Sequence, residues 1–529
     1  LLTGVINPSQ RKRSRREAGG LQKEWRENVW QLKPAMAAIA LCVLLLVMVY
    51  IYKYYEHVRR YPRGPLPLPL IGNLFQFNPN RLQDFLEECH EQYGSIFTVF
   101  TPHPLVILMD YEDIKEAFLV QGDKFSGRSG RFPDTAFMTR ENGGIIWSEG
   151  DEWREQRRAS LVILRDSGMG KGVMERRVHG SIENFLQHFE VVQGKETGFN
   201  PHWSIQTLVA NVINDVLFGY HYEYDQSDRL INFIKLLNVQ FDHHRTDPLS
   251  FLAIAFPFIE SIPILGFLAV GRWKRDTKKL ADHVQEDIEQ SLKRFDAEEE
   301  GDCFVHAYMQ RAAKNPSLNE EAMLNVVVDL FIAGVETTAT TLRWATLYLA
   351  AYPDAQKRIR EEIHRVVGRD RLPTMADRPE LPYTCASVQE TLRLANIVPV
   401  NVLHRSTEDT KVNGVFIPGD SIVVGQIYHV LQFGSAFAEK SNEFRPERFL
   451  LADGKTLNRE AMDEMVAFGV GKRQCAGETL ARMEVFLVLA TLVQRYEIGP
   501  APGRDINLTP LVGMISLPHE QPLSFRALL

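Results

Sequence analysis

The sequence has few cysteines and no excess of positive charge. Only five of its 529 residues are cysteine, and they are scattered along the chain. An odd, irregularly spaced set of this kind argues against a disulfide framework and favours a reducing compartment. The chain also has no CxxC motif or His-rich pair that would indicate a zinc site. Its formal net charge of −7 gives no reason to expect a nucleic acid partner.

The sequence also lacks internal repeats, low-complexity tracts and alternating βαβ units. Its composition, with 45% hydrophobic and 24% charged residues, is that of an ordinary globular protein. We expect an α-rich α+β fold, because long helical patterns follow only short β-like runs. The β-like runs are residues 96–100 and 106–108, and the helical patterns are residues 276–295, 320–351, 355–367 and 478–496.

An uncharged apolar run, residues 34–52, is close to the roughly 20 residues that a membrane-spanning helix requires. Lys53, Arg59 and Arg60 follow this run, and no small-x-small cleavage pattern is found after it. A cleaved signal peptide is therefore disfavoured. We interpret residues 36–60 as a single transmembrane signal anchor.

Residues 1–35 begin with Leu1 and carry a basic cluster at residues 11–16, whereas Met36 stands at the head of the apolar run. With Met36 as the start, all flanking positive charge lies after the run, and the positive-inside rule places the rest of the chain in the cytosol. We interpret residues 1–35 as an N-terminal extension or a gene-model artefact. A nuclear or anionic-lipid address is the alternative.

Residues 61–73 are rich in alternating prolines, which enforce an extended and stiff segment. A plain linker would not need such stiffness, so we interpret this segment as a hinge. No second linker follows it, and we expect residues 61–529 to form one large domain.

Residues 468–477 read FGVGKRQCAG and precede a helix-prone run at 478–488. Gly469 and Gly471 permit a tight backbone turn. Cys475 stands just before the helix, where backbone N–H groups and the helix dipole favour a thiolate. The alternative is a buried structural cysteine in a glycine-containing turn.

The longest helical pattern, residues 320–351, has glycine and threonines in its centre, against helix propensity. Thr337 can bond back to the Ala333 carbonyl and bend the helix beside Gly334. The alternative is a kink that serves packing alone. Two weaker patterns are E-x-x-R at Glu390 and Arg393, and W-x-x-x-R at 153–157, each of which places its two residues on one helix face.

These motifs, with P-E-R-F at 446–449, occur in an order that resembles the cytochrome P-450 family over about residues 61–520. The Cys475 loop and the F-S-G-R segment at 125–128 resemble microsomal animal enzymes of the second clan, which handle foreign compounds, fatty acids and steroids. The resemblance implies a cytochrome P-450 fold with a small β-rich lobe, and haem b bound through the thiolate of Cys475. It gives Glu336 and Thr337 the delivery of protons to dioxygen, and it makes Arg448 the third member of a buried cluster with Glu390 and Arg393. The propionate partners that it implies are Arg128, Trp153, Arg157, His404 and Arg473.

The resemblance also implies a monooxygenase that acts on a lipophilic small molecule and O2 at the endoplasmic reticulum membrane. Electrons would come from NADPH through NADPH–cytochrome P-450 reductase, with cytochrome b5 as a second candidate donor. Arg154, Arg158 and Lys472 would form a basic face for such a donor, or are plain solvated charges. A peroxide-rearranging isomerase or dehydratase, and a haem carrier or gas sensor, are the alternatives; neither needs the Glu336–Thr337 pair.

The substrate pocket is expected to be mostly apolar, with Phe233, Phe241 and Phe331 as bulky walls. Residues 257–270 are apolar and suit either the core or a segment that dips into the membrane over the substrate entrance. The resemblance places pocket residues in the segments 131–145, 233–241, 331–338, 397–403 and 512–517.

Overall fold

The structure is a computed structural model that describes residues 36–76, 78, 81–169, 172–193, 198–298, 301–511 and 513–528. The extension at residues 1–35, with its basic cluster, lies outside the described residues, as do Val512 and the side chain of Phe241. The chain separates into two compact units, Leu1–Tyr61 and Pro62–Leu529.

The described part of the first unit is a helix, Met36–Val58, with no part of its apolar stretch buried. Its 23 residues are long and apolar enough to cross a membrane. The helix therefore fits the anchor that we expected from the apolar run.

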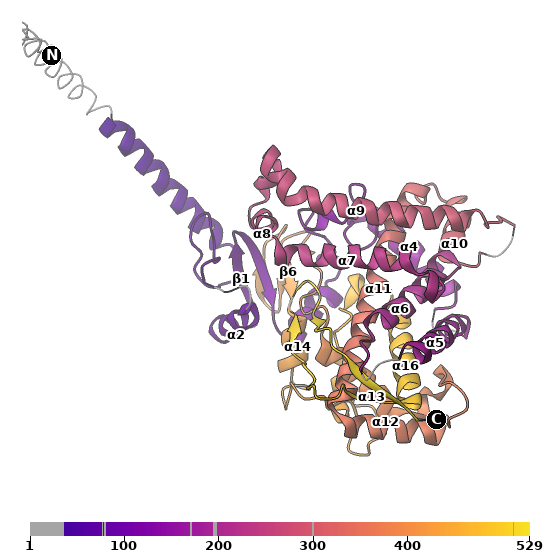
Figure 1. The fold of residues 1–529 in the computed structure, drawn as a ribbon. Helices are drawn as coiled ribbons and strands as arrows, with labels where there is room; N and C mark the ends of the chain where they lie inside the picture. Colours follow the sequence, from indigo (N-terminus) through magenta and orange to yellow (C-terminus); the bar gives the residue numbers. More distant parts are fainter. Residues whose placement is uncertain are drawn as a thin grey trace, which may run out of the picture. The chain divides into compact units, whose positions relative to one another are not determined.

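The second unit is mostly helical with several small sheets, which confirms the α-rich α+β prediction (Figure 1). Its helices are α2 (Leu82–Tyr93), α3 (Tyr111–Lys115), α4 (Gly150–Asp166), α5 (Gly172–Gln193), α6 (His202–Phe218), α7 (Asp228–Thr246), α8 (Pro248–Ala255), α9 (Pro263–Leu292), α10 (Phe304–Ala312), α11 (Glu320–Ala351), α12 (Pro353–Val366), α13 (Pro382–Ala395), α14 (Ile427–Phe433), α15 (Arg459–Asp463) and α16 (Glu478–Arg495). The prediction of a helix at 276–295 missed the first part of α9, which starts at Pro263 because a proline suits the first turn of a helix.

The main sheet has the strand order β1-β2-β6-β3. The strands are β1 (Ile96–Thr101), β2 (His103–Leu108), β6 (Ile422–Gly425) and β3 (His404–Arg405). β1 and β2 form an antiparallel hairpin, β6 lies parallel to β2, and β3 is antiparallel to β6. The described residues also form three two-stranded sheets: β7 (Tyr496–Pro500) with β10 (Leu523–Ala527), β4 (Thr410–Val412) with β5 (Val415–Ile417), and β8 (Pro510–Leu511) with β9 (Leu517–Pro518).

α11 is the core helix of the domain, with most of its 32 residues buried. Its start is capped by Asn319, whose side chain accepts a hydrogen bond from the Ala322 N–H. α6, α9, α13 and α16 pack around it. A helix that is apolar on nearly every face is stable only when neighbours surround it in this way.

The proline-rich segment is extended, as expected, but it packs against β1. A Cβ at Gly64 or at Gly72 would overlap the backbone of β1. Asn73 secures the contact, because its Oδ1 accepts a 2.8 Å hydrogen bond from the Phe100 N–H and its Nδ2 donates to the Pro65 carbonyl. Residues 62–73 are therefore an integral edge of the domain.

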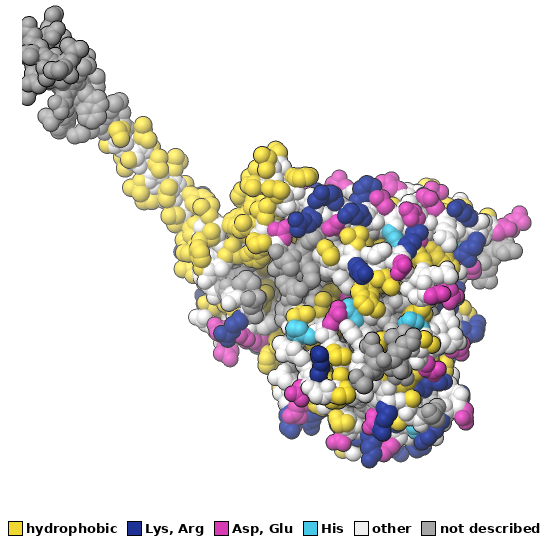
Figure 2. Space-filling model, viewed as in Figure 1, with side chains coloured by type: hydrophobic (Ala, Val, Ile, Leu, Met, Phe, Trp, Pro, Cys, Tyr) yellow, Lys and Arg dark blue, Asp and Glu magenta, His cyan; other side chains and the backbone are white. Residues whose placement is uncertain are grey.

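Residues 257–270 divide between the two roles that we considered. Ile259 and Val270 are buried in the core. Phe258, Ile264 and Phe267, in contrast, are 64%, 74% and 64% exposed. Figure 2 shows hydrophobic side chains gathered over this start of α9. An exposed apolar cluster of this kind suits contact with an apolar surface.

Candidate active site

Cys475 lies between a short turn, Gly471–Arg473, and the start of α16. The Cys475 N–H donates to the Phe468 carbonyl at 3.0 Å and closes the loop. Gly469 and Gly471 have φ values of 68° and 77°, the left-handed region that favours glycine. A Cβ at Gly471 would also overlap the carbonyl oxygen of Phe118. The predicted tight turn is confirmed, and Gly471 also permits a close backbone approach.

The backbone N–H groups at the helix start lower the pKa of the Cys475 thiol, as predicted. Burial raises the pKa of the thiol, and it outweighs the backbone N–H groups of Gly477 and Glu478, which lower it. The side chain is nevertheless exposed. The thiol is therefore open to a ligand, and a bound cation would favour its thiolate.

The buried surface of α11 is interrupted at its centre, where Ala333, Gly334 and Thr337 are half-buried. Thr337 Oγ1 donates to the Ala333 carbonyl at 2.7 Å, as predicted. The core helix therefore has a short, partly exposed strip of small residues at its centre.

The environments of Gly334 and Glu336 were not foreseen. A Cβ at Gly334 would stand 2.7 Å from Ile213 Cδ1 of α6, so glycine here permits close helix packing. Glu336 is buried and accepts hydrogen bonds from Gln206 Nε2 of α6 at 2.8 Å and from Thr340 Oγ1 at 3.1 Å. Its carboxylate therefore lies against α6, whereas the Thr337 hydroxyl turns back along α11.

Two of the predicted propionate partners, Arg473 and Arg128, meet at the segment 144–148. Arg473 Nη2 donates to the Ser126 and Ser148 carbonyls at 2.6 and 2.7 Å. Arg128 Nε donates to the Ile146 carbonyl at 2.7 Å. Carbonyl oxygens satisfy some of the donors of these groups without neutralising their charge.

The other three predicted partners lie close by. The ring of Trp153, on α4, stacks 3.7 Å from the Arg473 guanidinium carbon, and its buried Nε1 has no hydrogen-bond partner among the described residues. Arg157, one turn later, donates to the Gln474 carbonyl. His404 is buried, and its Nδ1 bonds to the Phe125 carbonyl at 2.7 Å, which leaves Nε2 for a further partner.

This region holds a buried excess of positive charge. Burial, and then repulsion from Arg128 and Arg157, lower the pKa of Arg473 to about 7. Burial also lowers the pKa of Arg128 to about 10. The carboxylate of Glu149 receives 2.6 Å hydrogen bonds from Arg405 and is already paired. Bound anions would relieve this repulsion, and the unpartnered indole N–H offers one more donor, so the residues fit the two carboxylates of haem.

Comparison with known proteins decides the family. The cytochrome P-450 family model matches residues 62–523, almost the whole of the second unit. The chain belongs to the cytochrome P-450 family. It is a cytochrome P-450 monooxygenase, and membership of this family implies a haem with a cysteine thiolate ligand.

Among curated relatives, cytochrome P-450 2H1 of Gallus gallus is 35% identical over 88% of this chain and 93% of its own length. Cytochrome P-450 2F3 of Capra hircus is 36% identical over 93% of this chain and 99% of its own length. Cytochrome P-450 2E1 of Bos taurus is 33% identical over 91% and 97%. The similarity to the microsomal animal type is therefore confirmed.

The E-x-x-R pair of this P-450 forms the predicted buried cluster. Glu390 receives two hydrogen bonds from Arg393, at 2.8 and 2.9 Å, and one from Arg448 Nε at 3.0 Å. Glu390 and Arg393 are completely buried. A salt bridge without solvent must have all its members paired, so the cluster serves the fold.

The prediction that Phe233 and Phe331 are bulky walls of the substrate pocket stays a prediction. Phe331 is fully buried, and its ring centroid lies 4.8 Å from that of Phe233 and 5.7 Å from that of Phe218. These rings fill the core between α6, α7 and α11. Periodicity does not distinguish a side chain that lines a pocket from one that fills the interior.

The sequence analysis missed Asn325 and Asp329, one turn apart on α11. Asn325 Oδ1 accepts a 2.7 Å hydrogen bond from Thr139 Oγ1, and Asp329 Oδ2 accepts bonds of 2.7 and 2.9 Å from the N–H groups of Ile145 and Ile146. These hydrogen bonds attach the loop to α11. It is the same loop whose carbonyl groups accept hydrogen bonds from Arg128 and Arg473. Two polar residues at i and i+4 in an apolar helix were the signal that could have revealed them.

The proposed basic face contains paired charges. Arg154 Nη1 lies 2.6 Å from Asp151, and Lys472 pairs with Asp123. Arg158 is exposed. Exposed ion pairs of this kind are worth about 0–1 kcal/mol, so an acidic partner could displace them readily.

Proposed function

We propose that this cytochrome P-450 inserts one oxygen atom of O2 into a lipophilic small molecule, such as a foreign compound, fatty acid or steroid. Electrons would come from NADPH through NADPH–cytochrome P-450 reductase, with cytochrome b5 as a further donor. The observation that carries the proposal is the exposed thiol of Cys475 beside a buried surplus of guanidinium groups. Bound haem supplies the iron that activates dioxygen.

The residues of the chain would divide the remaining tasks. Cys475 Sγ would bind the iron, and Arg473 with its neighbours would hold the propionates. Thr337 Oγ1 gives its hydrogen to the Ala333 carbonyl, so its lone pairs remain available to a water molecule or ligand. Glu336 would serve as a proton source. Because its carboxylate is hydrogen-bonded to Gln206 on one side of α11, the proton would have to move from that side of the helix to Thr337.

The membrane location is part of the proposal. Lys53, Arg59 and Arg60 follow the apolar stretch of Met36–Val58, and positive charge marks the cytosolic side of such helices. The catalytic domain would therefore lie on the cytosolic face of the endoplasmic reticulum. Protease digestion of intact microsomes should remove it, and a protected domain would contradict this orientation.

The experiment for the catalytic proposal compares Cys475→Ala with Cys385→Ala. Cys385 is also a free cysteine, but it is buried on α13. Reduced protein with carbon monoxide should lose the thiolate spectrum only in Cys475→Ala. With reductase and NADPH, the wild type and Cys385→Ala should oxidise members of a mixed lipid and xenobiotic library, measured by mass spectrometry. A thiolate spectrum in Cys475→Ala, or turnover without NADPH, would contradict the proposal.

A further inference from the structure

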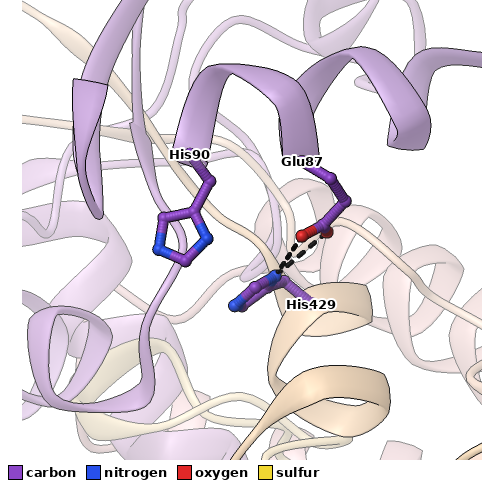
Figure 3. A group of neighbouring side chains, drawn as sticks. All are labelled: Glu87, His90 and His429. Atoms are coloured by element: carbon purple, nitrogen blue, oxygen red, sulfur yellow. Dashed lines mark hydrogen bonds and ion pairs between the residues drawn. The ribbon is translucent and has the colours of Figure 1, made fainter. Parts of the chain in front are cut away.

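A second group of chemically active side chains lies away from the Cys475 loop. Glu87 and His90 come from one face of α2, and His429 comes from α14 (Figure 3). Asp110 follows β2 directly. The side chains of Glu87 and His90 are each 26% exposed, Asp110 is 50% exposed and His429 is 8% exposed. The group is therefore open to an ion from solvent.

Three atoms of this group converge. Nε2 of His90 and Nε2 of His429 lie 3.4 and 3.5 Å from the same oxygen, Asp110 Oδ1. These distances exceed the usual 2.7–3.2 Å of an N–H···O hydrogen bond. A tetrahedral zinc ion with bonds of about 2.0–2.1 Å separates its ligands by about 3.4 Å. Each of the two distances to Asp110 Oδ1 therefore matches one edge of a zinc coordination tetrahedron.

Glu87 has a different place in the group. Its two carboxylate oxygens lie 2.8 and 3.0 Å from Nδ1 of His429 (Figure 3). A carboxylate in this position fixes the imidazole tautomer and leaves Nε2 for the metal, as in the carboxylate–histidine–zinc arrangement.

We propose that His90, His429 and Asp110 bind a zinc ion, with Glu87 as the positioning residue and a water molecule as the fourth ligand. Imidazole and carboxylate ligands without sulfur suit Zn²⁺. Cys89 is adjacent in sequence but is buried in the apolar core beneath α2, and burial raises the pKa of its thiol to about 11. It therefore faces away from the site and does not favour the thiolate that zinc would require.

The competing interpretation is a plain ion pair. Burial lowers the pKa of His429, but the neighbouring carboxylates of Asp110 and Glu87 outweigh it and raise the pKa to about 9. Zinc must therefore displace a proton from this ring. In that interpretation Asp110 Oδ1 pairs with both imidazole rings, at 3.4 and 3.5 Å, without an ion between them.

Bound zinc would link parts of the chain that are remote in sequence. α2 packs on β1, and α14 begins directly after β6 of the same sheet. The ion would therefore connect the helix that packs on β1 with the helix that follows β6. It would stabilise the folded domain, because the unfolded chain has no such site.

The test uses the full chain with its haem and Zn²⁺ alone as the probe, titrated against a fluorescent zinc indicator. We expect one zinc ion that His90→Asn removes and that Glu87→Gln binds about 10- to 100-fold more weakly. X-ray absorption at the zinc edge should show nitrogen and oxygen ligands only.

The control is His306→Asn, in the second potential metal group of the described residues, Asp302, Cys303 and His306. This variant should leave the zinc affinity unchanged. Zinc binding by His90→Asn with wild-type affinity, or sulfur in the zinc shell, would overturn the proposal and leave the ion pair as the interpretation. Because His90 is partly exposed, its variant should fold, and the reduced carbon monoxide spectrum checks this.

Discussion

Asp329 Oδ2 accepts a 2.7 Å hydrogen bond from the backbone N–H of Ile145 and thereby attaches the core helix to the loop before α4. In the same loop, the Ile146 carbonyl accepts a hydrogen bond from Arg128 Nε. One buried carboxyl group therefore positions the backbone on which the propionate-binding arginines depend.

The Asp329 contact should make stability depend on pH. Burial raises the pKa of Asp329 to about 7, although the Ile145 and Ile146 N–H groups lower it. Between about pH 4 and pH 7 the unfolded chain has lost this proton while the folded protein keeps it, so stability falls as the pH rises. The loss is about 1.4 kcal/mol per pH unit in that window.

Asp329→Asn removes this titration and keeps the shape of the side chain. Between pH 5 and pH 7 the wild type should lose about 2–3 kcal/mol more stability than the variant. Urea unfolding followed by haem absorbance at both pH values measures the difference. Parallel curves for the two proteins would show that the carboxyl group ionises normally.

Removal of Glu390 should impair folding. Glu390→Ala leaves Arg393 and Arg448 with buried charges and no counterion, at a cost of about 3–5 kcal/mol. The yield of haem-bound protein and its urea midpoint measure this. Glu439→Ala is the matched control, since its 3.0 Å pair with Arg445 is exposed and should be worth less than about 1 kcal/mol.

The two loop glycines should differ in their tolerance of a methyl group. Gly471→Ala would overlap the Phe118 carbonyl, so we expect loss of bound haem. Gly469→Ala has nothing within 4 Å of its new Cβ and bears only the left-handed strain of about 1–2 kcal/mol. Haem absorbance per mole of protein distinguishes the two, and equal retention would disprove the close approach at Gly471.

Thr337 should affect how electrons are used. Thr337→Ala removes a hydroxyl at the accessible strip of α11, and we expect product per NADPH to fall about tenfold or more with haem retained. Thr337→Ser should restore it. Thr341→Ala is the control, because that hydroxyl makes the same type of bond, 2.9 Å to the Thr337 carbonyl, but is buried. Equal coupling in all variants would remove the role of Thr337.

Features that depend on local chain geometry were predictable from the sequence. Glycine at 471, the backward bond of Thr337 and the Glu390–Arg393 pair follow from backbone conformation and helix spacing within a few residues. The helix at Met36–Val58 was also predictable from the sequence, because its length and apolar composition are enough to indicate a candidate membrane span. For these features, neighbours in sequence are the neighbours that matter.

Features that depend on packing were not predictable. The orientation of Glu336 toward Gln206 and the burial of Phe331 are set by α6, which lies more than a hundred residues earlier. The pKa of Cys475 follows from desolvation by surrounding protein, which the helix start does not overcome.

The proposed zinc site shows the same division. The sequence by itself determined the cytochrome P-450 family, an apolar helix long enough to span a membrane and a helical domain. It showed no zinc motif, because zinc motifs are recognised by short spacings. Only the tertiary structure placed His90 and His429 around one oxygen of Asp110. Their convergence depends on the sheet, which pairs β2 with β6 across some 300 residues of chain and thereby brings α14 to α2.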